Sequence, residues 1–171
     1  MQVTHYTSVW KWLQIKLTKC IQPRTPFLFD SLEKRMADSR QDLLDIGDRK
    51  FVVSIPVGRV KDWKKYELYD KLRRTTGAIQ LNFPIENLGG SMVRDIFYTT
   101  PTHSKEVFGF DIYGLLLRGY IYRKELEQLY ADYIQSSRPF QETDLQSVKV
   151  PEIWIPENIP LSRVVKNSCL A

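Results

Sequence analysis

The stretch EVFGFDIYGLLLRGYIYRKELEQLYADYI, from Glu106 to Ile134, contains the change of pattern on which the predicted fold depends. From Phe108 to Tyr122, apolar and aromatic residues are nearly continuous and glycines interrupt them, which is typical of a bent or tightly paired β-strand. From Lys124 onward, apolar residues recur every three or four positions and indicate one face of a helix. Because neither element can bury its apolar side alone, we expect the helix to pack on a sheet that other strands complete.

Alternation of apolar and polar residues predicts three further strands. The pattern is clearest from Ala78 to Glu86, and a turn at Gly89 and Gly90 follows it. Pro56 stands near the end of another alternating segment and predicts either an edge position or the end of strand pairing there. The three segments are residues 50–57, 78–86 and 92–100.

Two further helices and one loop are predicted from local signals. Asp30 followed by Glu33 resembles a capping box, so a helix is expected from there to Gly47. Asp62 is expected to cap a short helix. Residues 101–105 are polar and are expected to form a loop.

Residues 9–19 fit two periods. Read with period two, Leu13, Ile15 and Leu17 share a face, and the aromatic and β-branched content favours a strand. Read with the helical period, the segment has an apolar stripe, and Ser8 could act as its N-cap. A basic helix that carries tryptophan would be a candidate for a membrane interface. We prefer the strand and keep the helix as the alternative.

The two ends of the chain complete the predicted architecture. Residues 1–7 are expected to be a flexible N-terminus. Residues 139–171 contain several prolines, which cannot donate to a β-ladder, so this arm is expected at a sheet edge or as a strap on the surface. The predicted class is α+β, with one domain over residues 1–171, an antiparallel sheet, two or three helices packed on it and an extended Pro-containing C-terminal arm.

The composition predicts a soluble globular protein, with 43% hydrophobic and 26% charged residues. No apolar run reaches the length of a membrane span, and Lys11 and Lys16 interrupt any signal sequence, so a cytosolic setting is expected. Cys20 and Cys169 lack the spacing of zinc ligands and are expected to stay reduced in such a setting.

The net charge is +5, and the sequence concentrates basic residues in one segment. Residues 59–74 contain seven basic and three acidic residues, and therefore carry 7 − 3 = +4. Such a segment attracts phosphate-rich surfaces in a salt-dependent way, although a solvated face is the plainer interpretation. The candidate contacts to an acidic surface, lipid or nucleocapsid, are Arg59, Lys61, Lys64, Lys65, Lys71, Arg73 and Arg74.

Residues suited to chemistry are few. The histidines His5 and His103 have no cysteine or acidic residue at metal-ligand spacing, and no glycine-rich phosphate-binding motif or nucleophile elbow occurs. The strongest candidates for an active site are Asp111 and His103. The sequence nevertheless predicts a protein that is not an enzyme and uses no cofactor or metal.

Aromatic residues stand beside basic residues at several places, as in Trp10-Lys11-Trp12. This pattern suits base stacking with phosphate neutralisation, and it equally suits a lipid interface or a protein partner. The candidate membrane or partner anchors are Trp10, Lys11, Trp12 and Trp63.

Three stretches, in chain order, give the sequence a resemblance to a known family. The segment 115–134 resembles the strand-then-helix segment of rhabdovirus matrix proteins. The segment 13–27 is similar to the strand and Pro-containing connector of the animal members, and 69–75 (YDKLRRT) is similar to a Tyr-Lys-Leu-Arg-Arg-Thr stretch of the lyssavirus branch. A long Lys- and Pro-rich N-terminal arm and a Pro-Pro-x-Tyr motif are lacking and the chain is short, which favours the plant-infecting branch.

The resemblance implies a viral structural (matrix) protein that condenses the ribonucleoprotein, binds the inner face of the envelope membrane and self-associates during assembly and budding. Its location would be the virion, beneath the envelope, and the cytoplasm and membranes of the host cell. The expected partners are the viral nucleoprotein–RNA complex, an anionic membrane surface, other copies of the chain and the envelope glycoprotein. The alternative is a single-stranded RNA-binding viral accessory protein that uses Trp63 and Tyr66 for stacking.

Overall fold

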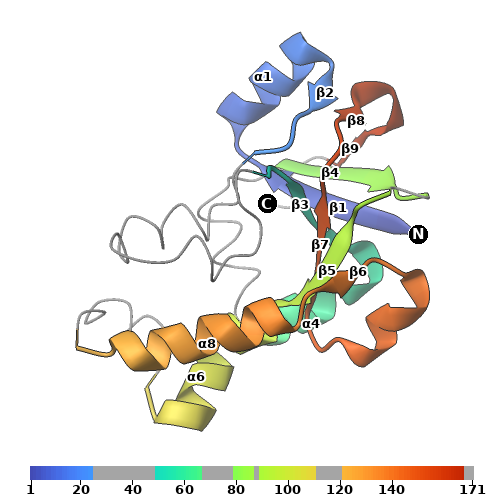
Figure 1. Cartoon of the computed structure of the whole chain (residues 1–171). Coiled ribbons are helices and arrows are strands. Elements are labelled where there is room, and N and C mark those ends of the chain that lie inside the picture. Colours follow the sequence, from blue (N-terminus) through green and yellow to red (C-terminus); the bar gives the residue numbers. More distant parts are fainter. Residues whose placement is uncertain (25–48, 67–78, 87–88, 111–120, 168–171) are drawn as a thin grey trace.

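The computed structural model describes residues 1–24, 49–66, 79–86, 89–110 and 121–167. Its strands are β1 (Gln2–Thr7), β2 (Cys20–Ile21), β3 (Val52–Pro56), β4 (Ile79–Pro84), β5 (Met92–Asp95), β6 (Arg138–Pro139), β7 (Pro151–Ile155), β8 (Ile159–Pro160) and β9 (Val165–Asn167). Seven of these strands form one antiparallel sheet in the order β6-β5-β7-β3-β1-β4-β9 (Figure 1). The pair β2–β8 forms a separate small sheet.

The α-helices of the described residues are α1 (Val9–Thr18), α4 (Val60–Lys65), α6 (Pro101–Phe108) and α8 (Arg123–Gln135). Short 3-10 helices are η1 (Val57–Arg59), η2 (Ile96–Thr99), η3 (Glu142–Ser147) and η4 (Leu161–Arg163). Helices α4, α6 and α8 lie toward one end of the molecule, and α1 lies with β2 and β8 at the other (Figure 1). The predicted α+β class, an antiparallel sheet with helices packed on it, is confirmed.

The sheet is buried on both faces. On one face, Phe51 of the chain before β3 and Trp154 of β7 pack with Leu129 and Tyr133 of α8 and with Trp63 of α4. On the other face, the core consists of residues from five strands of this sheet, from β2 and β8, from α1 and from the chain around η3, including Val3, Ile15, Leu81, Phe83, Val93, Leu145, Ile153 and Ile155. Successive residues of one strand therefore pack into two different cores, one on each face of the sheet.

The strongest periodic signals are confirmed. Strand β4 alternates between buried and partly exposed residues, with Ile79, Leu81 and Phe83 buried. Helix α8 covers the predicted helix 124–135, and its stripe of Leu126, Leu129, Tyr130 and Tyr133 is buried.

The preference for a strand over residues 9–19 is wrong, because the segment forms helix α1. The N-cap that belonged to the helical alternative is confirmed, because the Ser8 hydroxyl accepts a hydrogen bond from the Lys11 amide at 3.2 Å. Only the helical period puts Ile15 into the core with Trp12 packed against it. Tertiary packing thus outweighs the β-propensity of the segment.

Both ends of the chain lie deeper in the sheet than predicted. The N-terminus predicted to be flexible is strand β1, which pairs with β3 and β4 and buries Val3 completely. The C-terminal arm is extended, but its predicted place at an edge holds for β9 and not for β7, which lies between β5 and β3. Pro151 is the first residue of β7, where a strand tolerates the missing N–H.

Three local predictions also need correction. The strand predicted over residues 92–100 ends at Asp95 and continues as η2. The loop predicted at 101–105 is the start of α6, because the buried Thr100 hydroxyl accepts from the His103 amide at 3.1 Å and Pro101 occupies the first turn. Phe108 ends that helix and does not begin a strand.

Two more positions differ from expectation in detail. Pro56 ends β3, as one of its two interpretations required, although β3 is central and not an edge strand. Asp62 lies in the first turn of α4 and is not its N-cap, which is Arg59. The predicted helix 30–47 and most of the predicted strand, residues 111–120, lie outside the described residues.

Candidate functional site

The two ends of the chain meet in one lobe. Cys20 and Ile21 of β2 pair with Pro160 and Ile159 of β8, and the Leu161 amide donates to the Lys19 carbonyl at 2.8 Å. Helix α1 leads into this pairing, and β9 continues from it along the edge of the main sheet (Figure 1). We call residues 8–24 and 158–167 the terminal lobe.

The terminal lobe holds the positive charge of the protein. Its two segments contain no aspartate or glutamate, whereas the whole chain has 25 lysines and arginines and 20 acidic residues. The rest of the chain therefore has fewer basic than acidic residues, with 25 − 6 = 19 against 20. The six basic residues of the lobe are Lys11, Lys16, Lys19, Arg24, Arg163 and Lys166.

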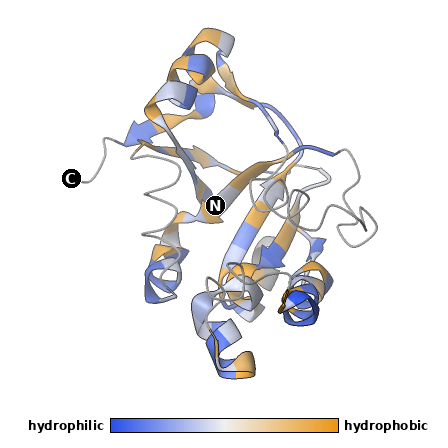
Figure 2. Ribbon diagram, turned by 90° about the vertical axis from the view of Figure 1, so that its left-hand side faces the viewer, coloured by the Kyte–Doolittle hydropathy of each residue, from blue (hydrophilic) through white to orange (hydrophobic). Residues whose placement is uncertain are grey.

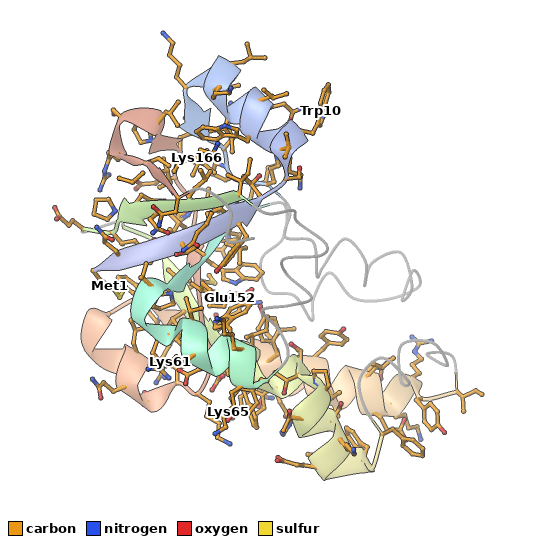
Figure 3. All side chains as sticks on the ribbon, turned by 180° about the vertical axis from the view of Figure 1, so that it is seen from behind. Met1, Trp10, Lys61, Lys65, Glu152 and Lys166 are labelled. Carbon is orange, nitrogen blue, oxygen red and sulfur yellow. The ribbon has the colours of Figure 1, made fainter. Side chains whose placement is uncertain are left out.

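Helix α1 presents a large apolar surface to solvent on this lobe. Leu17 is 83% exposed, Trp10 70%, Val9 63% and Leu13 42%. At 100° per residue these four side chains fall on one face, away from Ile15, which is buried. Trp10 projects outward from the helix in Figure 3, and the ribbon of α1 carries both hydrophobic and hydrophilic colours at the outside of the molecule in Figure 2. We call Val9, Trp10, Leu13 and Leu17 the α1 stripe.

The described part of the chain leaves the α1 stripe exposed. A single exposed leucine or valine is ordinary in folded proteins, but a contiguous apolar face marks an interaction surface. The basic side chains Lys11 and Lys16 are exposed on the same helix. The α1 stripe and the charge of the terminal lobe together make this lobe the candidate functional site.

The predicted anchors Trp10, Lys11 and Trp12 therefore lie on one helix, but they are not equivalent. Trp10 is exposed, while Trp12 is half-buried against the core. The ammonium groups of Lys16 and Lys166 lie 5.9 and 5.6 Å from the centroid of the Trp12 ring.

Trp63, the fourth predicted anchor, is not at the surface. It is 3% exposed, packs in the core and donates from Nε1 to the Pro151 carbonyl at 3.3 Å. Its prediction as a membrane or partner anchor is wrong, because the helix that carries it turns this side chain toward the sheet.

Arg59 of the predicted basic segment likewise makes its polar contacts within the protein. Its guanidinium pairs with Asp62 and donates to the carbonyls of Leu145, Val148 and Lys149 at 2.7 to 2.9 Å. Arg59 therefore holds the chain around η3 against α4. It is not available as a contact to an acidic surface.

The other basic residues of that segment divide into two groups. Lys61, Lys64 and Lys65 are exposed on α4, on the side of the sheet away from α1, and Figure 3 shows Lys61 and Lys65 far from Trp10. Lys71, Arg73 and Arg74 lie outside the described residues.

A buried polar cluster that the sequence did not reveal joins α8 to the sheet. The Glu152 carboxylate of β7 accepts from the Tyr133 hydroxyl and from Trp154 Nε1, the latter at 2.9 Å. Arg94 of β5 pairs with Glu152 in the sheet, and its guanidinium carbon lies 4.5 Å from the centroid of the Trp154 ring. Burial raises the pKa of both Glu152 and Tyr133. All four side chains are enclosed, so the cluster serves packing and not a substrate.

The candidate catalytic residues are not gathered into a reactive site in the described part. The His103 ring packs between Phe97 and Tyr98, with centroid distances of 5.0 and 5.3 Å. His5 lies in β1 and donates from Nδ1 to the Val53 carbonyl at 2.9 Å. Asp111 lies outside the described residues.

Two searches of the described residues gave negative findings. Residues 1–24, 49–66, 79–86, 89–110 and 121–167 contain no cluster of three or more His, Cys, Asp or Glu side chains arranged to hold a metal ion. No helix in the same ranges has the length and apolar character needed to cross a bilayer. Comparison with protein-family models, curated proteins and solved structures found no match to this chain.

Proposed function

We propose that this protein is a non-enzymatic structural protein of the matrix type, which attaches to the anionic inner surface of a viral envelope. The observation that carries the proposal is the α1 stripe, an exposed apolar face on a lobe that holds six basic residues and no acidic residue. Tryptophan and leucine side chains that enter the interfacial region, with lysines beside them at headgroup level, are the combination by which helices lie on anionic bilayers.

The basic residues of α4 provide the second surface of the proposal. Lys61, Lys64 and Lys65 are exposed on the other side of the sheet from α1 and suit an acidic partner such as the viral nucleoprotein–RNA complex. A protein with these two surfaces would lie beneath the envelope of the virion and on membranes in the host cytoplasm. Self-association during assembly and budding, and contact with the envelope glycoprotein, belong to the same proposal.

The alternative function, single-stranded RNA binding by an accessory protein, has less support from the described residues. Trp63 is buried, and the Tyr66 ring packs edge-on against Phe97 at a centroid distance of 5.0 Å. Base stacking needs an aromatic face open to solvent, which Trp63 does not offer and which is restricted at the partly buried Tyr66.

Vesicle flotation tests the proposed function. We expect the protein to float with vesicles that contain phosphatidylserine, to bind neutral phosphatidylcholine vesicles weakly, and to lose binding as salt rises. Because a fully buried leucine side chain contributes about 1.5–3 kcal/mol, Leu17→Ala should weaken binding by roughly tenfold or more. Trp10→Ala should have an effect of the same order.

Val107→Ala is the matched control for the apolar substitutions. Val107 is 53% exposed on α6, at the other end of the molecule, so its loss should leave vesicle binding unchanged. Failure to prefer anionic vesicles, or equal losses for Val107→Ala and Leu17→Ala, would contradict membrane attachment through α1. The absence of multimers at high protein concentration would argue against the matrix role.

A further inference from the structure

The Trp12 indole lies beside two lysines that come from opposite ends of the chain. Lys16 follows Trp12 by one turn of α1, and Lys166 stands in β9, which lies alongside β4 at the sheet edge. Both ammonium groups lie within 6 Å of the same ring centroid, at 5.9 and 5.6 Å. Figure 3 shows Lys166 beneath α1, between the helix and the strands. We call Lys16, Trp12 and Lys166 the lysine pair site.

The Trp12 ring is a common contact of the two charges. Trp12 is half-buried and packs against the core, so its face is held in place by the fold. The ring of an indole attracts ammonium groups, and this attraction favours positions of both lysines near Trp12. Lys166 reaches the ring because β9 pairs with β4, with Leu81 opposite Lys166.

The two charges repel each other, and the lobe offers nothing to offset the repulsion. Its segments contain no acidic residue, and neither lysine forms an ion pair within the described part of the chain. Two cations beside one ring, with no carboxylate in either segment of the lobe, favour a bound anion, and an anion with a double charge most of all.

The phosphate monoester has this charge, since it carries between about −1.5 and −2 near neutral pH. The phosphodiester of phosphatidylserine or phosphatidylcholine carries a single negative charge. On α1, Lys16 lies next to Val9 and Leu13 of the stripe when the helix is viewed along its axis, at the edge of the face proposed to enter the bilayer. Its ammonium group would then reach the level of the phosphates, as lysines beside an apolar face do.

We propose that the lysine pair site binds the phosphate monoester headgroup of an anionic membrane lipid. The site adds headgroup selectivity to the membrane attachment proposed above and rests on that proposal. It also makes the membrane surface a composite of both chain ends, since it needs α1 and β9 together.

The test compares vesicles that contain phosphatidic acid with vesicles that contain phosphatidylserine, at contents adjusted to the same measured surface potential. We expect the wild-type protein to bind the phosphatidic acid vesicles more tightly, by about fivefold, which corresponds to the contribution of one lysine near an anionic surface. Lys16→Gln and Lys166→Gln should each abolish this preference while binding to phosphatidylserine vesicles falls less.

Lys11→Gln is the matched control, because Lys11 is an exposed lysine of the same helix and the cations over the Trp12 ring in the described residues are Lys16 and Lys166. It should lower binding to both vesicles equally and preserve the preference. Free glycerol 3-phosphate, added as a competitor, should displace the protein from neither vesicle at concentrations that match the accessible lipid phosphate.

Each contrary result has a separate meaning. If the wild-type protein binds both anionic vesicles equally, or Lys11→Gln removes the preference as fully as Lys166→Gln, the lysine pair site is not selective and this inference is overturned. If glycerol 3-phosphate competes as well as the lipid, the lipid source is wrong. If neither anionic vesicle binds the protein, the proposed function itself fails.

Discussion

Arg59 shows that the type of a residue does not determine where its charge is used. The sequence places it at the start of the most basic segment, yet its guanidinium is surrounded by three backbone carbonyls and Asp62. Its neighbour Lys61, two residues later in α4, is exposed. Backbone carbonyls that close the turn around η3 need a donor, and a long planar cation supplies several donors at once.

Replacement of Arg59 by methionine should therefore destabilise the fold. The substitution keeps much of the aliphatic length but removes hydrogen bonds from a charged donor, which contribute about 1.5–3 kcal/mol. We expect the free energy of unfolding, measured by urea denaturation, to fall by this order. Lys61→Met, the control, should change it by less than about 0.5 kcal/mol. Equal effects of the two substitutions would contradict the role of Arg59 in holding η3 against α4.

The buried cluster around Glu152 likewise shows that the type of a residue does not determine whether it is exposed. Glu152 and Arg94 are polar residues of two adjacent strands, and nothing in their sequence neighbourhood distinguishes them from exposed positions. The structure encloses them because Tyr133 and Trp154 supply hydrogen bonds and an aromatic face there. A polar group can be buried where such partners satisfy it.

At the scale of elements, α1 and α8 are both amphipathic helices, but the fold uses them differently. The apolar stripe of α8 is enclosed by the sheet, with Leu129 completely buried. Helix α1 buries Ile15 and leaves Leu17 83% exposed. The apolar residues of α8 therefore stabilise the fold, while the α1 stripe remains free for an interaction.

The same substitution in the two helices should separate these roles. Leu129→Ala removes a fully buried side chain and should lower the free energy of unfolding by about 2–5 kcal/mol. Leu17→Ala should change it by less than about 0.5 kcal/mol, because its side chain is already in water. Thermal and urea unfolding of the two variants measure the difference. A large loss of stability for Leu17→Ala would show that the α1 stripe is covered within the protein.

Strand β7 shows that the neighbours of a strand decide whether it lies at the surface or inside the sheet. Its sequence, with Pro151 at one end and Pro156 just past the other, fits a surface strap, yet all five of its residues are buried at the centre of the sheet. The prolines are compatible with this because they flank the ladder and do not interrupt it. An unbroken run such as Ile153, Trp154 and Ile155 is the pattern of a strand covered on both faces.

At the scale of the whole molecule, stability should depend on pH through groups that act in opposite directions, among them His5 and Glu152, while burial lowers the pKa of His103 as it does that of His5. Burial lowers the pKa of His5 in β1, and burial raises the pKa of Glu152 in β7. Stability that depends on neutral His5 is present above the unfolded pKa of about 6.5 and is lost as pH falls toward the lower folded pKa. Stability from protonated Glu152 is lost as pH rises from the unfolded pKa through the higher folded one.

His5→Gln isolates the first of these effects. We expect the free energy of unfolding of the wild-type protein to fall between pH 7 and pH 5 more steeply than that of the variant, by at most about 1.4 kcal/mol per pH unit. Urea unfolding at several pH values measures both curves, and Glu152→Gln serves as a comparison in which the sign of the difference is reversed. Parallel curves for wild type and His5→Gln would show that His5 has the same pKa in the folded and unfolded states.

The proposed attachment also belongs to the whole molecule, because its basic residues come from two distant segments. Residues 8–24 and 158–167 are far apart in the sequence, and they contain four and two basic residues, fewer than the seven of residues 59–74. The lack of acidic residues in both segments was the signal that could have identified them, whereas a search for the densest run of basic residues led to 59–74. Pairing of β2 with β8 joins the two segments into one lobe, and pairing of β4 with β9 attaches the lobe to the main sheet.

The sequence by itself determined the α+β class and the elements with a strong period, such as β4 and α8, because a regular apolar spacing records which side of an element is buried. Only the tertiary structure decided that β1 and β7 lie inside the sheet, that α1 is a helix with one face left exposed, and that Arg59 and Trp63 point inward. The physical reason is that period is a property of one segment, whereas burial depends on the partner that distant segments bring to it.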